Sequence, residues 1–163
     1  MSDIFIIAAK RSAIGSFGGS LKNTTPIDLA IPVAKAAIEQ SGIQATIINH
    51  AVYGHVIQTE ARDMYSPRCI AMGSGLPETA PAFLVNRLCG SGLQAIVSGI
   101  QLIRLGDAST VLAGGVEVMS RGPYLLPAQR WGARMGDSTA IDMMAGALHD
   151  PFGIGHMGIT AEN

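Results

Sequence analysis

The sequence has 163 residues, with 11 lysines and arginines against 12 aspartates and glutamates, and a formal net charge of -1. This length corresponds to about one domain, on a prior of roughly 100–200 residues each, and the charge argues against a nucleic-acid-binding surface. No apolar run reaches the roughly 18 residues of a membrane-spanning helix, and no basic stretch precedes the first apolar one, so neither a membrane partner nor a targeting peptide is expected.

The composition also bears on compartment and surface. Two cysteines twenty positions apart form no disulfide framework, which favours a reducing, cytoplasmic location. Charged residues make up 14% and hydrophobic residues 48% of the chain, whereas ordinary globular domains have about 25% charged residues. We therefore expect another subunit, or more of the same polypeptide, to cover part of the surface.

Strands and helices are predicted to alternate along the first two thirds of the chain. Short apolar runs predict buried strands, and apolar residues spaced three or four apart predict helices. The expected strands are residues 4–9, 51–56, 83–88 and 110–116, and the expected helices are residues 24–41, 62–73 and 90–106. This order predicts an α/β fold with a mostly parallel sheet. Pro32 should kink the first helix or delay its start.

Cys89 lies between the predicted strand 83–88 and the helix that opens at Gly90. The first N–H groups of a helix lack intrahelical partners and carry partial positive charge, so helix N-termini favour thiolates. Gly90 and Gly92 leave room for an acyl group, and the Cys89 N–H could donate to an oxyanion. Placement alone leaves two interpretations open: a nucleophile, or a small, buried, inert cysteine.

The same segment matches a dinucleotide-binding pattern. Gly90, Gly92 and Ala95 fit G-x-G-x-x-G/A between a strand and a helix, and Glu117 lies near the spacing of a ribose-binding acid. Against this, the pattern usually occupies the first βαβ unit, and two helical segments precede it here. An NAD-binding oxidoreductase therefore remains an alternative.

The other cysteine and the histidines are expected to be mainly structural. Cys69 lies among apolar residues of the predicted helix 62–73, and no pair of Cys and His has zinc-like spacing, so no metal site is expected. A cysteine nucleophile needs a base. Either one of the four histidines folds back onto Cys89, or the base is absent from this chain. The histidines are His50, His55, His149 and His156.

Residues 85–96, VNRLCGSGLQAI, resemble the acyl-enzyme segment of the thiolases, in particular the biosynthetic acetyl-CoA acetyltransferases or β-ketothiolases. Four more segments resemble the family's opening loop, second strand, strand-to-loop exit and loop-domain signature: residues 11–19, 54–58, 114–120 and 156–163. The resemblance implies a layered α-β-α, thiolase-like fold. Residues 1–118 would form most of the N-terminal, nucleophile half, and residues 119–163 the start of an inserted loop domain.

The resemblance also implies a reaction and its residues. Cys89 would take an acyl group from acyl-CoA, and the carbanion of a second acetyl-CoA would attack it, giving a 3-ketoacyl-CoA by Claisen condensation. The backbone at Cys89 and Gly90 would support the oxyanion, His156 and Met157 would line the CoA-thioester pocket, and Leu148 would touch CoA. No cofactor beyond these CoA thioester substrates is implied.

Thiolases are more than twice this long, and their second half carries a Gly-His-Pro motif and a second, proton-shuttling cysteine that this sequence lacks. We therefore expect an N-terminal piece that is inactive alone. Thiolases form dimers or tetramers, with residues from about 125 to 140 as a contact loop by analogy. A β-ketoacyl synthase, loaded from an acyl-carrier protein, and a non-catalytic scaffold fragment are further alternatives.

Overall fold

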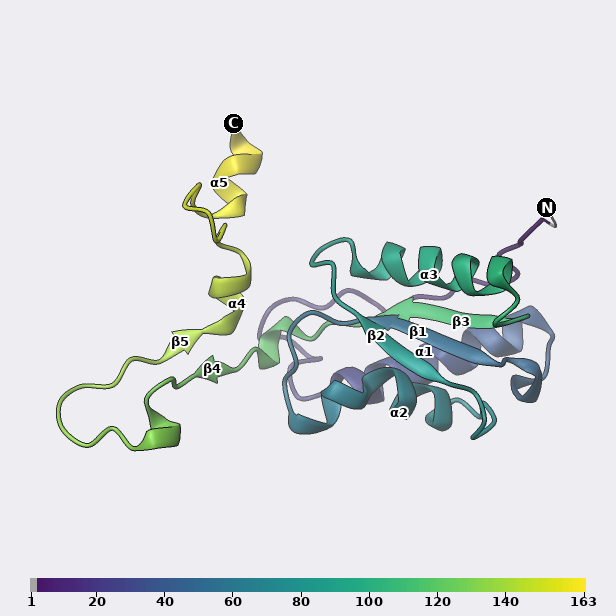
Figure 1. Ribbon diagram of the computed structural model, residues 1–163, viewed down its shortest axis with the longest axis horizontal. Helices are drawn as coiled ribbons and strands as arrows, with labels where there is room; N and C mark the ends of the chain where they lie inside the picture. Colours follow the sequence, from purple (N-terminus) through teal and green to yellow (C-terminus); the bar gives the residue numbers. More distant parts are fainter. Residues whose placement is uncertain (1–2) are drawn as a thin grey trace.

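A parallel three-stranded sheet lies between helices in this computed structural model, which describes residues 3–163. The expectation that the chain has no targeting peptide falls partly on Met1 and Ser2, which lie outside the described residues. Helix α3 covers one face of the sheet, α1 and α2 cover the other, and the later elements extend as an arm (Figure 1). The elements of the body are α1 (Pro26–Ser41), β1 (His50–Gly54), α2 (Ser66–Gly73), β2 (Ala82–Val85), α3 (Ser91–Leu105) and β3 (Val111–Gly115), with 3-10 turns η1 (Ala45–Ile47), η2 (Ala61–Tyr65) and η3 (Met119–Arg121). The elements of the arm are β4 (Tyr124–Leu125), η4 (Gln129–Trp131), β5 (Ile141–Asp142), α4 (Met143–Ala147) and α5 (Met157–Glu162).

The strand order is β2-β1-β3, and both pairings are parallel. Ala51 of β1 is opposite Ala82 of β2 and Leu112 of β3. All five residues of β1 are buried, because the central strand has a helix layer on each face. The predicted α/β class and the parallel sheet are therefore confirmed.

The two faces of β1 contact different helix layers. Ala51 and Tyr53 belong to one apolar core with Ile27 of α1 and Ile70 of α2. Val52 is fully buried too, and strand alternation directs its side chain to the opposite face, under α3. This arrangement fixes where the N-terminus of α3 lies relative to the strand ends.

Helix α1 has the ends that its sequence predicts. The Thr25 hydroxyl accepts a hydrogen bond from the Asp28 N–H at 3.1 Å, and Gly42 closes the helix in the left-handed conformation with a φ of 72°. The helix begins at Pro26 and continues through Pro32, so the internal proline does not delay its start.

The predicted helix 62–73 is two elements. Residues 61–65 form the 3-10 turn η2, and α2 begins only at Ser66, with Pro67 in its first turn. The buried Asp63 carboxylate accepts hydrogen bonds from the Thr59 and Glu60 N–H groups at 2.8 and 3.2 Å. These bonds stabilise the turn as a unit separate from the helix.

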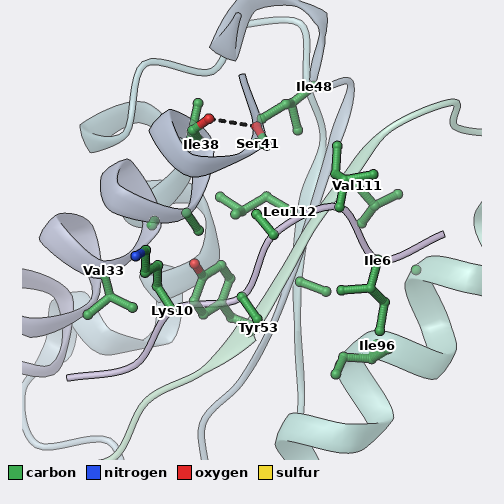
Figure 2. A pocket seen from close by; sticks show the side chains of 18 of the residues that line it. Ile6, Lys10, Val33, Ile38, Ser41, Ile48, Tyr53, Ile96, Val111 and Leu112 are labelled. Atoms are coloured by element: carbon green, nitrogen blue, oxygen red, sulfur yellow. Dashed lines mark hydrogen bonds between the residues drawn. The ribbon is translucent and has the colours of Figure 1, made fainter. Parts of the chain in front are cut away.

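The expectation of a buried strand at residues 4–9 is wrong. This segment is extended but pairs with no strand within residues 3–163, and the side chains of Phe5 and Ile6 are 75% and 74% exposed. A groove of about 850 Å³ separates it from β3. Figure 2 shows Ile6 at one end of the groove and Lys10 at the other, with Tyr53 of the sheet between them. Strands that share a hydrogen-bonded ladder lie about 4.8 Å apart. With the groove between them, residues 4–9 and β3 form no such ladder.

The segment Leu88–Leu105 is long and apolar enough, by length and composition alone, to cross a membrane. It is mostly α3, which buries Ala95 and Gly99 against the sheet and carries Arg104 in its last turn. A Cβ on Gly99 would lie 3.1 Å from a methyl of Val111. This segment packs on the sheet by one face only: 17% of it is buried, and Leu93 and Leu105 are 69% and 77% exposed.

Candidate active site

Cys89 lies in the turn between β2 and α3 and its side chain is exposed. Gly90 is the residue that precedes the first turn of α3. Strand β2 ends at Val85, and α3 starts at Ser91, two residues after Cys89, so the sulfur lies at the helix N-terminus. The alternative expectation that Cys89 is buried is therefore wrong.

Some backbone N–H groups near the sulfur donate hydrogen bonds within the turn, and others do not. The Gly90 N–H donates to the Arg87 carbonyl at 3.1 Å, and the Ser91 N–H donates to the Leu88 carbonyl at 2.9 Å. Within residues 3–163, the N–H groups of Cys89 and Gly92 make no hydrogen bond of good geometry. The Cys89 N–H is thus available to an oxygen that binds beside the sulfur.

Two glycines at the strand ends allow the turn to sit directly on the sheet. A Cβ on Gly54, the last residue of β1, would lie 2.6 Å from the carbonyl carbon of Ser91. A Cβ on Gly115, the last residue of β3, would lie 3.2 Å from the Gly92 Cα. Any larger residue at Gly54 would therefore displace the start of α3.

Glu117 has a structural role beside this turn. Its carboxylate accepts hydrogen bonds from the Val56 N–H at 2.9 Å and the Ile57 N–H at 3.0 Å. It also lies 3.5 Å from Nε2 of the fully buried His55, whose Nδ1 lies 3.4 Å from the Ser66 hydroxyl. With both carboxylate oxygens engaged by the protein, Glu117 is a poor candidate for binding a ribose.

Leu148, His156 and Met157 come together in the arm. The Met157 N–H donates to the Leu148 carbonyl at 2.8 Å. His156 Nδ1 accepts from the Gly158 N–H at 3.0 Å and so begins α5, and its ring packs edge-on against that of His149. Figure 1 shows α4 and α5 standing apart from the body, so the structure joins these three residues to one another but not to Cys89.

In residues 3–163, no histidine folds back onto Cys89. Within residues 3–163, no side chain makes a hydrogen bond to the Cys89 sulfur. His50 is buried and packs edge-on against Phe83, and the other three histidines have the contacts given above. Cys69 packs against the core, as expected, and both thiols are free.

Sequence reasoning did not identify the residues that shape the turn. Leu88 has a φ of 47°, the one positive φ of a residue other than glycine in residues 3–163. Asn86 and Ser91 bind its backbone. Their polar side chains on either side of Leu88 were the available signal, because asparagine and serine often bind nearby backbone groups in turns.

The body is a three-layered α/β fold, and its exposed cysteine lies in a strand-to-helix turn. Together these features define a class of proteins that present a thiol at the N-terminus of a helix. The profile described as "Thiolase, N-terminal domain" matches residues 4–163. The chain therefore belongs to the thiolase family.

Named relatives and solved structures agree with this assignment. The chain is 54% identical over 161 residues to the β-ketothiolase BktB of Cupriavidus necator, covering 99% of this chain and 41% of that protein. It is 42% identical to an acetyl-CoA acetyltransferase of the same organism, covering 100% of this chain and 42% of that protein. Its fold matches human mitochondrial 3-ketoacyl-CoA thiolase in complex with CoA at a TM-score of 0.93 and 38% identity, covering 98% and 41% of the two chains. It matches Bacillus anthracis acetyl-CoA acetyltransferase at a TM-score of 0.90 and 42% identity, covering 97% and 40%.

The chain thus spans about two fifths of the length of the relatives it matches. The profile that covers the glycines flanking Ser91 is described as that of a thiolase domain, not of a dinucleotide-binding one.

Proposed function

We propose that this protein is an acyltransferase in which Cys89 carries an acyl group between two CoA thioesters. The exposed position of Cys89 at the N-terminus of α3 is the observation that carries this proposal. It is supported by the names of the relatives, a β-ketothiolase and an acetyl-CoA acetyltransferase, and by the solved thiolase that contains CoA.

The proposed reaction has two half-reactions. In the first, the Cys89 sulfur attacks the carbonyl carbon of acyl-CoA, a new C–S bond forms, and the CoA thiolate leaves and takes up the proton that the cysteine lost. In the second, a proton leaves the α-carbon of acetyl-CoA, and the carbanion attacks the acyl carbon. The C–S bond to Cys89 breaks, the expelled Cys89 thiolate takes up the proton that left the α-carbon, and a 3-ketoacyl-CoA is formed. Thiolysis is the same sequence in reverse.

The turn supplies two of the features that this chemistry needs. The free N–H of Cys89 can donate to the oxygen that becomes negative as the sulfur attacks. A Cβ on Gly92 would meet no atom within 4 Å, so there is open space at the first turn of α3, three residues after Cys89. Leu148, His156 and Met157, already held together in the arm, would bind the CoA side of the substrate.

We further propose that the protein self-associates into dimers or tetramers and works in the cytoplasm without an additional cofactor. The exposed apolar side chains of the arm support the first point. The two free thiols are compatible with a reducing compartment.

Transfer of the acyl group to Cys89 can be tested directly. In the full-length protein, Cys89→Ser should lower acetoacetyl-CoA thiolysis by roughly a thousandfold or more, since the nucleophile is lost. Mass spectrometry after incubation with acetyl-CoA should find one acetyl group on the wild-type protein and none on this variant.

Cys69→Ser is the matched control, because it removes the other thiol of the chain and should leave acetylation intact. Iodoacetamide should label the exposed Cys89 well before Cys69, and acyl-CoA should protect it. Acetylation of Cys89→Ser, or loading from an acyl-carrier protein but not from CoA, would contradict the proposal.

A further inference from the structure

The backbone immediately before the nucleophile is held in an unfavourable conformation. Leu88 is left-handed, with a φ of 47°, a region in which the Cβ of an L-residue lies too close to its own backbone. Strained residues of this kind persist only where neighbouring contacts hold them, and they gather at functional sites. Leu88 is 46% exposed, so burial of its side chain is not the main contact that holds it.

Two side chains hold this conformation through hydrogen bonds. The Leu88 N–H donates to the Asn86 Oδ1 at 3.0 Å. The Arg87 N–H donates to the Ser91 hydroxyl at 2.8 Å, and that hydroxyl donates to the Leu88 carbonyl at 2.6 Å. Polar backbone groups on both sides of the strained torsion are therefore bound by Asn86 or Ser91.

Ser91 is itself fixed by packing. It is 4% exposed, and its backbone lies against the place where Gly54 has no side chain. Ser91 therefore presents its hydroxyl to the turn from a fixed position beside the end of β1. Asn86 is exposed, and its amide lies 3.5 Å from the Val56 carbonyl.

Building on the proposed function, we propose that Ser91 and Asn86 are positioning residues for acyl transfer. By holding Leu88 left-handed, they set the position of the Cys89 sulfur and the direction of the Cys89 N–H. When these bonds are lost, Leu88 relaxes toward the ordinary regions of φ and ψ, and the sulfur and the N–H no longer converge on one carbonyl group. Small displacements of reacting groups have large effects on rate.

The test compares single variants of the purified full-length protein, because residues 1–163 alone are expected to be inactive. Ser91→Ala and Asn86→Ala should each lower kcat about tenfold, while KM for acyl-CoA changes less than about twofold, because the reacting atoms move and the arm does not. Asn86→Asp keeps an oxygen that can accept from the Leu88 N–H, and should recover most of the activity lost in Asn86→Ala.

Ser98→Ala is the matched control. It makes the same chemical change in the same helix, and its hydroxyl accepts from the Gln94 side chain at 3.1 Å rather than binding the backbone of the turn. It should leave kcat and KM unchanged. An equal loss of kcat in Ser98→Ala would mean that the effect arises from α3 as a whole, and would overturn the inference.

A second measurement does not depend on acyl transfer. The rate at which iodoacetamide alkylates Cys89 at neutral pH should fall about fivefold in Ser91→Ala and Asn86→Ala, with the rate at Cys69 as the internal reference. Should Ser91→Ala fail to fold, the exposed Asn86 provides the second variant.

The outcomes separate the two proposals. Unchanged alkylation of Cys89 in both variants overturns the positioning role, whether or not the protein transfers acyl groups. Slower alkylation in the variants, together with a wild-type Cys89 that acyl-CoA never acylates, supports the positioning of the sulfur and contradicts the proposed function.

Discussion

At the residue scale, Leu88 has a conformation that few side chains tolerate. A β-branched residue is a pronounced outlier at positive φ, so Leu88→Val should lower the free energy of unfolding by about 1 kcal/mol. Leu88 is nearly half exposed, so little of this loss would come from burial. Urea unfolding measures the change. Leu88→Gly is the control, since glycine adopts this conformation freely, and a loss as large as that of Leu88→Val would contradict the assignment of strain.

Tyr53 provides a pH-dependent test of the core. Its side chain is 5% exposed, and burial raises the pKa of the Tyr53 phenol above its usual value. Above about pH 10 the phenol ionises in the unfolded chain but stays protonated in the folded one. The unfolded state then binds fewer protons, so stability falls as the pH rises.

Tyr53→Phe should therefore show a shallower loss of stability than the wild-type protein between about pH 10 and about pH 12, as measured by urea unfolding at each pH. Tyr65→Phe is the matched control, because Tyr65 is 66% exposed and should leave the slope unchanged. Equal slopes for wild type and Tyr53→Phe would contradict the burial of the phenol.

The sequence was informative about Cys89 but not about the residues around it. The position of Cys89 between an apolar strand and an apolar helix was sufficient to place it at a helix N-terminus. The φ of Leu88 was not predicted, because asparagine and serine side chains can bind several backbone groups in a turn, and the sequence does not specify which of these hydrogen bonds form. The burial of Ser91 depends on a contact with Gly54, 37 positions earlier.

At the scale of the elements, the packing of α3 on β1 depends on Gly54. Gly54→Ala should lower the free energy of unfolding by roughly 3 kcal/mol, because the new methyl would lie within 2.7 Å of the Ser91 backbone and side chain. Thermal or urea unfolding tests this. Gly92→Ala, at the start of α3, has open space and should stay within about 0.5 kcal/mol of wild type or exceed it. Equal effects of the two variants would contradict the close approach.

The sequence correctly predicted the helices whose ends are marked by capping residues or glycines. Thr25, Pro26 and Gly42 mark the ends of α1, and the apolar spacing marks α3. Residues 4–9 show where such reasoning stops: their composition is that of a strand, but a strand also needs a neighbour at hydrogen-bonding distance. The division of residues 61–73 depends on Asp63, whose side chain competes with the helix for backbone N–H groups.

At the scale of the whole molecule, the arm exposes large apolar side chains. Trp131 is 85% exposed and Met135 is 97% exposed. Trp131 is also the single tryptophan of the chain, so its fluorescence reports on this region alone. If the arm is the contact between subunits, raising the protein concentration should shift the emission to shorter wavelength as Trp131 becomes buried.

Met135→Asp should weaken that association, since a charge in an apolar contact loses its hydration. Analytical ultracentrifugation would measure a dissociation constant raised by about tenfold or more. Ile47→Asp makes the same kind of change on the body, at a residue that is 52% exposed, and should leave association unchanged. Association that is equally weak in both variants would argue against the arm.

The division of the chain at residue 118 stays a prediction, although the arm begins just beyond η3. The low content of charged residues agrees with the exposure of many apolar side chains on both body and arm. The composition indicated that part of the surface is apolar and could be covered by another subunit or segment. It did not show which residues form that part of the surface.

The outer edge of β3 has no neighbouring strand within residues 3–163, and beside it lies the groove that Ile6 and Tyr53 help to line. Such an edge has a row of unpaired backbone N–H and C=O groups, which can form hydrogen bonds with an extended peptide from another molecule. Concentrated solutions of this chain should therefore be prone to forming filaments, with copies joined edge to edge. Thr110→Lys, which places a positive charge next to that edge, should reduce the formation of filaments.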